Sequence, residues 1–260
     1  MCLGGLVTTH KINLLKAARD LFDYLDPLSE LSGEVSCISK RSGRLEGHAK
    51  DPISGGLRLA TLLGPGYFGR TGGHVLSLGA GGSTTALVLY FSRKPNTIDR
   101  PRRMLIVDRS AGRIEELSRM VGSIKSDIEF EFHCHEDSRQ NDELMDALPK
   151  GSLVINATGM GKDLPGSPIT DAGRFPIDGV AWELNYRGEL RFLQQALAQR
   201  VERNLIVEDG WVYFLHGWTQ VIAQALEIRL DEIIFGRLAA IAEVIRPATQ
   251  ASAELASRDR

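Results

Sequence analysis

The sequence predicts an α/β protein in which a doubly wound parallel sheet is joined to a smaller α/β domain. Two observations lead to this prediction. From Val75 onward, short apolar strands alternate with helical patterns, and a glycine-rich loop follows the first of these strands. Such alternation is typical of a mostly parallel sheet that carries helices on both of its faces.

The residues before this alternation predict the smaller domain. Residues 11–25 place apolar side chains at helical spacing, which predicts an amphipathic helix. Residues 33–50 alternate apolar and polar side chains on both sides of Arg41–Gly43, which predicts a β-hairpin. A second helix is expected over 51–63, where Asp51 precedes a proline as an N-cap precedes a first helical residue.

Strands and helices of similar length make up the alternating region. The strands are expected over 75–78, 104–107, 129–133, 153–157 and 180–183. The helices between them are expected over 84–91, 112–121, 141–148 and 190–200. A later amphipathic helix over 230–245 is expected to pack on the smaller domain or on a second subunit, which makes a homodimer possible.

Glycine-rich residues 64–73 mark a domain boundary. We expect four parts along the chain. With the family resemblance described below, they are 1–68 as the N-terminal part of an α/β substrate domain, 69–214 as a nucleotide-binding Rossmann-type domain, 215–245 as helices that return to the substrate domain, and 246–260 as a polar tail.

Composition and charge narrow the partners that this protein can have. The chain has 260 residues, of which 43% are hydrophobic and 25% are charged, as is usual for a globular protein. A formal net charge of −2 gives no electrostatic reason to expect nucleic acid or an anionic membrane surface as a partner. No apolar run approaches the roughly 20 residues of a membrane helix. The N-terminus has no secretory signal pattern, so we expect a cytoplasmic protein.

Neither a disulfide framework nor a metal site is expected. Cys2, Cys37 and Cys134 are odd in number and far apart in the chain. Cys134 lies in "HCHE" (133–136), but ligands on one extended segment converge poorly and no second cluster supports them. A partly exposed strand end is the simpler interpretation.

The glycine-rich loop lies within "VLSLGAGGSTTALVLYF" (75–91). In a nucleotide-binding crossover, glycines permit a tight turn and a close approach of the pyrophosphate, and the helix N-terminus offers N–H groups to the anion. The usual third glycine would fall at Thr84, so a plain strand–turn–helix is the alternative. The surrounding alternation favours a dinucleotide, with contacts expected from Gly79, Ala80, Gly81, Gly82 and Ser83.

A second cofactor determinant is expected at the end of the next strand. Asp108 ends "LIVD" and is followed by Arg109. An acidic residue here can accept hydrogen bonds from the adenosine ribose, whereas an arginine can pair with a 2′-phosphate. A carboxylate beside a phosphate dianion is unfavourable, so Asp108 favours NAD, while Arg109 keeps NADP open.

Several motifs occur together in an order and spacing that resemble the shikimate/quinate dehydrogenase family. They are "THK" (9–11), "GEVSCIS" (33–39), "GHAKD" (47–51), "GAGGS" (79–83), "VDRS" (107–110), "INATGMG" (155–161), "ELNYRG" (183–188) and "DGWVYFL" (209–215). The resemblance implies a two-domain oxidoreductase that transfers a hydride between NAD or NADP and a CH–OH group of a shikimate-, quinate- or polyol-like substrate.

The resemblance assigns catalysis to Lys11 and Asp51. Reduction of a ketone by hydride places negative charge on the carbonyl oxygen and requires a proton there. A lysine ammonium can stabilise that charge and donate the proton, while a neighbouring carboxylate orients the amine and holds substrate hydroxyls. Without the resemblance, a solvated first-turn lysine and a capping aspartate would explain the two residues as well.

The resemblance also implies further contacts. It assigns Asn156, Thr158, Gly210 and Tyr213 to the cofactor. Gly210 matches a glycine that lets the nicotinamide approach the backbone, and Tyr213 takes a position where methionine is usual. To the substrate it assigns Tyr186, Thr8 or Thr9, Ser36 in place of an asparagine, and Gln220, one helical turn after Gly217, which falls at the usual glutamine position.

The departures from the family lie on the substrate side. Family members usually begin with a strand and helix whose serine pair holds the substrate carboxylate, and this sequence starts after that segment. Either the start is truncated or the substrate is held differently. Ala49 and Lys50 also replace the asparagine and threonine before Asp51. A dehydrogenase for a substrate other than shikimate is therefore expected, and a non-catalytic nucleotide-binding protein derived from the family is the alternative.

Overall fold

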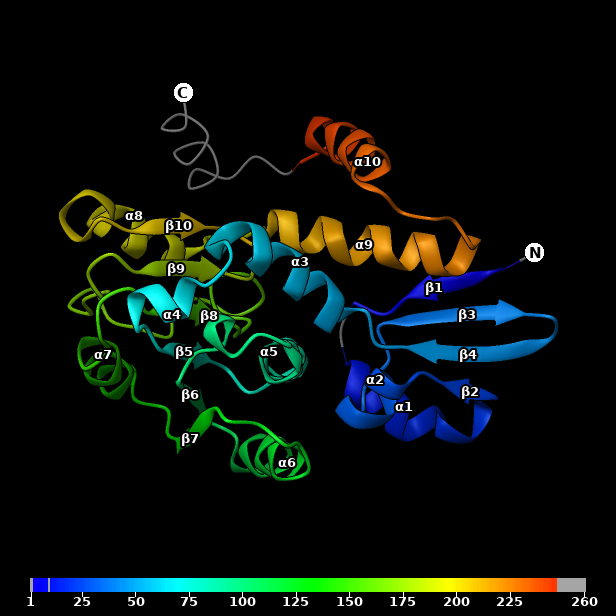
Figure 1. The fold of residues 1–260 in the computed structure, drawn as a ribbon, viewed down its shortest axis with the longest axis horizontal. Helices are drawn as coiled ribbons and strands as arrows, with labels where there is room; N and C mark the ends of the chain where they lie inside the picture. Colours follow the sequence, from blue (N-terminus) through cyan, green and yellow to red (C-terminus); the bar gives the residue numbers. More distant parts are fainter. Residues whose placement is uncertain (1, 9, 247–260) are drawn as a thin grey trace. The chain divides into compact units, whose positions relative to one another are not determined.

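The structure is a computed structural model that describes residues 2–8 and 10–246 (Figure 1). These residues form two compact units. The first unit combines the described residues of 1–62 with Thr85–Tyr90 and Val212–Arg246, and the second contains Leu63–Thr84 and Phe91–Trp211. The assignment of one part to substrate and another to cofactor stays a prediction. Thr9 and residues 247–260 of the predicted tail lie outside the described residues.

The first unit is built on a four-stranded sheet in the order β1-β3-β4-β2. Its strands are β1 (Gly4–Leu6), β2 (Tyr24–Leu25), β3 (Cys37–Arg41) and β4 (Arg44–His48). Strands β3 and β4 form the predicted hairpin, because Arg41 pairs with Arg44 across a two-residue turn. The helices of this part of the chain are α1 (Lys11–Ala18), α2 (Pro27–Ser32) and α3 (Asp51–Leu63).

The helix predicted over 11–25 is too long. Helix α1 ends at Ala18, a short 3-10 turn η1 (Arg19–Leu21) follows, and Tyr24–Leu25 form β2, which runs parallel to β4. Leu25 is buried with Leu15 and Val35. The apolar spacing therefore marked buried residues correctly, but these residues belong to two elements, α1 and β2. Pairing with β4 therefore outweighs the local helical preference after Ala18.

Two further helices complete the first unit. They are α9 (Trp211–Leu226), whose residues from Val212 belong to this unit, and α10 (Glu232–Val244), close to the predicted 230–245. The α10 residue Phe235 stacks on His216 of α9 with ring centroids 4.1 Å apart. Among the described residues, no helix is long and apolar enough to cross a membrane.

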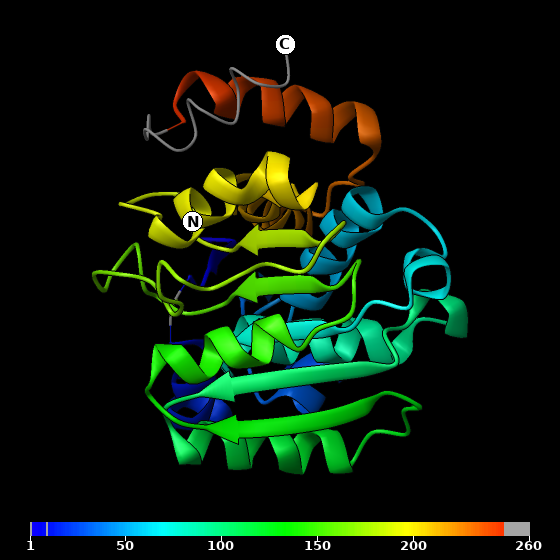
Figure 2. The same cartoon turned by 90° about the vertical axis from the view of Figure 1, so that its left-hand side faces the viewer.

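The second unit contains the predicted parallel sheet, whose strands all run in one direction (Figure 2). The spatial order is β10-β9-β8-β5-β6-β7. The bounds are β5 (Val75–Leu78), β6 (Arg103–Asp108), β7 (Glu129–Cys134), β8 (Leu153–Asn156), β9 (Val180–Glu183) and β10 (Ile206–Glu208). This is the doubly wound order of a Rossmann sheet, so the fold class is confirmed. Strand β10 was not predicted from the sequence.

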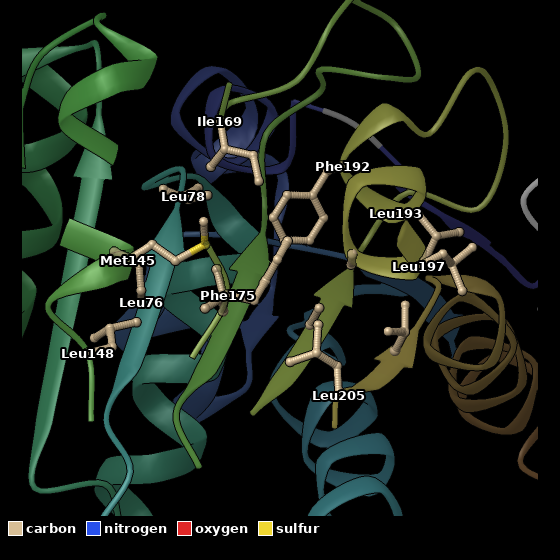
Figure 3. Packing of buried hydrophobic residues seen from close by; sticks show 14 of the residues in the cluster. Leu76, Leu78, Met145, Leu148, Ile169, Phe175, Phe192, Leu193, Leu197 and Leu205 are labelled. Carbon is tan, nitrogen blue, oxygen red and sulfur yellow. The ribbon is translucent and has the colours of Figure 1, made fainter. Parts of the chain in front are cut away.

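Helices alternate with these strands along the chain. They are α4 (Tyr67–Thr71), α5 (Gly82–Arg93), α6 (Ala111–Gly122), α7 (Ser138–Asp146) and α8 (Arg191–Arg203), with a 3-10 turn η2 (Thr97–Asp99). Residues Thr85–Tyr90 of α5 belong to the first unit. Figure 3 shows Leu76 and Leu78 of β5 in one cluster with Met145 of α7 and Phe192 of α8. Because the central strands are buried on both faces, they show the continuous apolar runs from which they were predicted.

The sheet creates one position that suits a ligand. The strand order reverses between β5 and β8, which are neighbours although β6 and β7 come between them in the chain. In open α/β sheets, ligands bind beyond the carboxyl ends of the strands at such a switch point. The glycine-rich loop after β5 and the "INATGMG" segment after β8 both begin there.

Candidate active site

The glycine-rich loop turns sharply between β5 and α5. Gly79 has φ of 111°, and a β-carbon there would lie 2.7 Å from the Ala157 carbonyl oxygen, so only glycine fits between the two loops. Thr84, which stands at the place of the usual third glycine, donates from its hydroxyl to the Gly79 carbonyl at 2.6 Å. The loop therefore keeps its tight turn although the fingerprint is incomplete.

The N-terminus of α5 remains accessible to a ligand. Gly81, Gly82 and Ser83 are only partly buried, and a β-carbon on Gly81 would meet no atom within 4 Å. Helix N-termini carry N–H groups without intrahelical partners and a partial positive charge. This end of α5 can therefore accept a pyrophosphate as the sequence predicts.

Asp108 lies at the end of β6 beside this loop. Its carboxylate accepts hydrogen bonds from the Ala80 N–H at 2.8 Å and from the Ser110 N–H at 2.8 Å, and the Arg113 guanidinium lies 3.8 Å away. Two backbone donors hold a negative charge next to the glycine loop. Arg109, the alternative determinant, is exposed.

The segment after β8 is held by a buried carboxylate that the sequence did not indicate. Glu183, at the end of β9, accepts from the Asn156 side-chain amide at 2.7 Å and from the backbone and side chain of Asn185 at 2.8 and 2.7 Å. Asn156 in turn accepts from the backbone N–H and hydroxyl of Thr158. Burial raises the pKa of Glu183 to about 8 against the opposing effect of these donors. Asn156 is thus an internal support of the loop, and the partly exposed Thr158 is better placed to contact a ligand.

Three further residues were predicted to contact the cofactor or the substrate. Gly210 and Tyr186 lie in the second unit, and Tyr213 lies in the first. A β-carbon at Gly210 would lie 2.0 Å from the Leu184 carbonyl oxygen, so crowding by Leu184 already requires glycine. Tyr186 lies beside Trp211, with ring centroids 5.9 Å apart. Tyr213 belongs to the first unit, where a β-carbon at Gly55 of α3 would lie 3.6 Å from its ring.

In the first unit, the structure brings together Lys11 and Asp51. Lys11 is the first residue of α1, Asp51 is the first residue of α3, and the Lys11 ammonium donates a hydrogen bond to the Asp51 carboxylate. The side chains are 16% and 9% exposed, so the pair is nearly buried but reachable. Burial opposes the charged form of Lys11, but the Asp51 and Glu34 carboxylates outweigh it and raise the pKa of Lys11. Lys11 is therefore an ammonium ion at neutral pH.

Glu34 is a third ionisable residue of this cluster and was missed in the sequence. It is fully buried, and neither carboxyl oxygen has a hydrogen-bond partner among the described residues. Burial and the Asp51 carboxylate raise the pKa of Glu34 to about 8, although Lys11 opposes this shift. The signal in the sequence was a lone glutamate in "GEVSC", where the alternation of the hairpin calls for an apolar or small residue.

We expect the buried carboxyl of Glu34 to make the protein less stable as the pH rises from about 5 to 8. In this window the unfolded chain has lost the proton that folded Glu34 keeps, so the free energy of unfolding falls by up to ~1.4 kcal/mol per pH unit. Below this window both states are protonated. Glu34→Gln should flatten the dependence of the denaturant midpoint on pH, whereas the exposed Glu30→Gln should not. Parallel curves for Glu34→Gln and the wild type would contradict this prediction.

The predicted substrate residues have mixed positions. The Ser36 hydroxyl accepts a hydrogen bond from the Lys50 N–H at 2.6 Å and is fully buried, so it fixes the backbone before Asp51. Thr8 is exposed after β1, and Thr9 lies outside the described residues. Gln220 lies on α9 and lines a cavity together with Lys50. Asp51 begins α3 itself, so the predicted N-cap role is wrong.

Comparison with known proteins finds shikimate dehydrogenases as relatives. No family model matches this sequence. The chain is 29% identical over 217 residues to a shikimate dehydrogenase (NADP(+)) of Methylobacterium radiotolerans, a match that covers 82% of this chain and 68% of the relative. It is 30% identical over 185 residues to the corresponding protein of Streptococcus thermophilus, where the match covers 69% of this chain and 59% of the relative. Both relatives support the resemblance of this chain to the shikimate/quinate dehydrogenase family.

Solved structures agree on the fold. A shikimate 5-dehydrogenase from Listeria monocytogenes, in complex with shikimate and NAD, matches with a TM-score of 0.65 at 19% identity and covers 91% of this chain and 75% of its own. A 5-ketofructose reductase from Gluconobacter sp. strain CHM43 matches with a TM-score of 0.62 at 20% identity, covering 92% and 79%. The matched proteins are named as shikimate dehydrogenases and a 5-ketofructose reductase, which supports a dehydrogenase function for this chain.

We expect titration to show tighter binding of NADH than of NADPH. Asp108 keeps a negative charge beside the glycine loop, and this charge repels a 2′-phosphate. Asp108→Asn should narrow the difference between the two dissociation constants, in a protein whose thermal melt shows that it is folded. A clear preference of the unmodified protein for NADPH would show that Arg109 or Arg113 dominates instead.

Proposed function

We propose that this protein interconverts an alcohol and a ketone on a hydroxylated ring or chain substrate other than shikimate, with Lys11 as the proton donor and Asp51 as its partner. The observation that supports this proposal best is the ion pair of these two side chains in a nearly buried position. A protein that only senses a nucleotide has no need of a lysine held as an ammonium ion away from solvent.

The roles of the residues follow from the charges that the reaction creates. When bound, NADH or NADPH supplies the hydride to the carbonyl carbon. Negative charge then develops on the carbonyl oxygen, and the Lys11 ammonium neutralises it by donating its proton. The Asp51 carboxylate fixes the direction of the ammonium group and can accept a hydrogen bond from a substrate hydroxyl. The raised pKa of Lys11 keeps the proton available before the substrate arrives.

The residues of the second unit suit the cofactor. We infer that Gly79, Gly81, Gly82 and Ser83 hold the pyrophosphate at the start of α5, and that Asp108 accepts from the adenosine ribose. Thr158 and Ala80 lie in the loops that border this position. The geometry of Gly79 and the open space at Gly81 support this inference, because together they leave room for an anion over the helix N-terminus.

A screen of substrates with both cofactors tests the proposal. The compounds should be hydroxylated cyclohexene and cyclohexane acids, their amino-substituted analogues, keto sugars and inositol-like polyols. We expect one class to change the NADH or NADPH absorbance at a rate proportional to enzyme concentration. If the cofactor binds tightly and nothing on this panel reacts, the protein is better described as a non-catalytic nucleotide-binding relative.

A further inference from the structure

A cavity of about 390 Å³ lies in the first unit, beside the C-terminal half of α9. It lies within the usual size range of small-molecule sites. We call it the Lys50 cavity and define it by six of its lining residues, which are Arg41, Lys50, Gln220, Gln224, Glu227 and Arg229. Three of these side chains are cationic and one is anionic, so the lining favours an anion.

Lys50 is the residue that makes this cavity unusual. Its ammonium group is half-buried, and its partner is the side-chain oxygen of Gln224 at 2.7 Å, which carries no charge. Burial lowers the pKa of Lys50 most strongly, the Asp26 and Cys37 side chains oppose this effect, and Arg41 adds a smaller lowering. A half-buried ammonium without a carboxylate partner among the described residues has a large free-energy gain available from an anionic ligand.

The other charges of the cavity set the size of the anion that fits. Arg41 is paired with Glu227 at 3.0 Å and also donates to the Gln224 carbonyl, so its charge is already balanced. Arg229 is exposed and forms no ion pair with a described residue. Lys50 and Arg229 therefore remain for a ligand, while the Glu227 carboxylate disfavours a phosphate dianion. A single carboxylate matches this set of charges best.

The backbone connects the cavity to the catalytic pair. Lys50 immediately precedes Asp51, its N–H donates to the Ser36 hydroxyl at 2.6 Å, and its carbonyl accepts from Ser54 N–H of α3 at 2.9 Å. These bonds fix the position from which the Lys50 side chain extends toward α9. A substrate carboxylate at Lys50 would therefore be bound by the residue next to the Asp51 that holds the Lys11 ammonium.

We propose that the Lys50 cavity binds the carboxylate group of the substrate, with Lys50 supplying the main positive charge and Gln220 an amide donor. The inference rests on the proposed function for the statement that the bound carboxylate belongs to a substrate. It makes Lys50 a determinant of specificity for substrates that carry a carboxylate. The site differs from a pair of serine hydroxyls, because here charge rather than neutral hydrogen bonding recognises the anion.

Binding of matched compounds tests the proposal. Shikimate and quinate are titrated calorimetrically into the full-length protein with NADH or NADPH present, together with their neutral carboxamides. The wild type should bind at least one acid more tightly than its amide. Lys50→Met, which keeps the aliphatic stem, should weaken binding of that acid by about 10- to 100-fold and leave the amide nearly unchanged. The matched control Lys40→Met, on the exposed side of β3, should behave as the wild type.

The outcomes separate this proposal from the proposed function. Three results would each overturn the carboxylate site. In the first, Lys50→Met weakens binding of the acid and of the amide equally. In the second, Lys50→Met binds the acid as tightly as the wild type does, and in the third, the wild type binds neither acid. If one of these results came together with turnover of neutral polyols, the proposed dehydrogenase function would be supported and the carboxylate site would be rejected. Binding of an acid that depends on Lys50 but leads to no turnover would support the site and count against the dehydrogenase.

Discussion

Lys11→Ala should lower kcat for the best substrate by about 10²–10⁴-fold, the usual contribution of general acid catalysis. The substitution removes the proton donor and the charge that stabilises the developing oxyanion, while the cofactor residues of the second unit are unchanged. The dissociation constant of NADH should therefore stay within about twofold of the wild type. Steady-state kinetics and fluorescence titration of the cofactor measure both quantities.

Removal of the lysine also leaves the nearly buried Asp51 carboxylate without its counter-charge, which destabilises the fold. Lys11→Arg keeps the positive charge beside Asp51 but donates a proton far less readily, so it separates catalysis from folding. We expect kcat to remain low in this variant and Lys16→Ala, on the same helix, to be fully active. Asp51→Asn should lower kcat and raise KM. Turnover by a folded Lys11→Ala variant at the wild-type rate would contradict the role of Lys11.

Gly81→Val should abolish binding of NADH and NADPH while the protein remains folded. The backbone of Gly81 is extended, and its β-carbon would point into open space, so the fold has no reason to reject a side chain. That open space is where the pyrophosphate is proposed to approach the start of α5, and a valine would fill it. Titration with the cofactor measures the affinity, and a thermal melt of the same sample shows whether the protein is folded.

A matched control uses a glycine whose β-carbon would also be unobstructed. Gly236→Val on α10 meets no atom within 4 Å and lies in the first unit, so cofactor affinity should not change. If a folded Gly81→Val protein bound the cofactor as tightly as Gly236→Val does, the assignment of the glycine-rich loop to the pyrophosphate would be wrong.

Periodicity in the sequence was sufficient for the parallel sheet except its edge strand β10, but it was not sufficient for the first unit. Strands such as β5 and β8 are buried on both faces, so their continuous apolar runs identify them directly. Residues 19–25 carried the same apolar spacing as the helix before them, yet Tyr24–Leu25 form a strand. The Asp23 carboxylate accepts from the Leu45 N–H at 2.7 Å, a contact with β4 that local spacing does not reveal.

The site was predictable where its residues sit in motifs and unpredictable where distant segments meet. Lys11, Asp51 and the glycine loop could be proposed from the sequence because each lies in a short pattern of fixed spacing. The Lys50–Gln224 contact joins residues 174 positions apart, and Glu183 acts on Asn156 from a neighbouring strand. Such contacts depend on the tertiary packing of charged side chains, for which local sequence carries no signal.

Transfer of deuterium from the cofactor to a product tests the central claim most directly. NADH and NADPH deuterated at C4 of the nicotinamide, on either face, are incubated with the wild-type protein and the ketone forms of the panel compounds, and the products are examined by mass spectrometry. We predict an alcohol that gains one deuterium in an enzyme-dependent reaction, with the label lost from one cofactor face only. Tight binding of the cofactor without any labelled alcohol across the panel would contradict the conclusion that this chain is a working dehydrogenase.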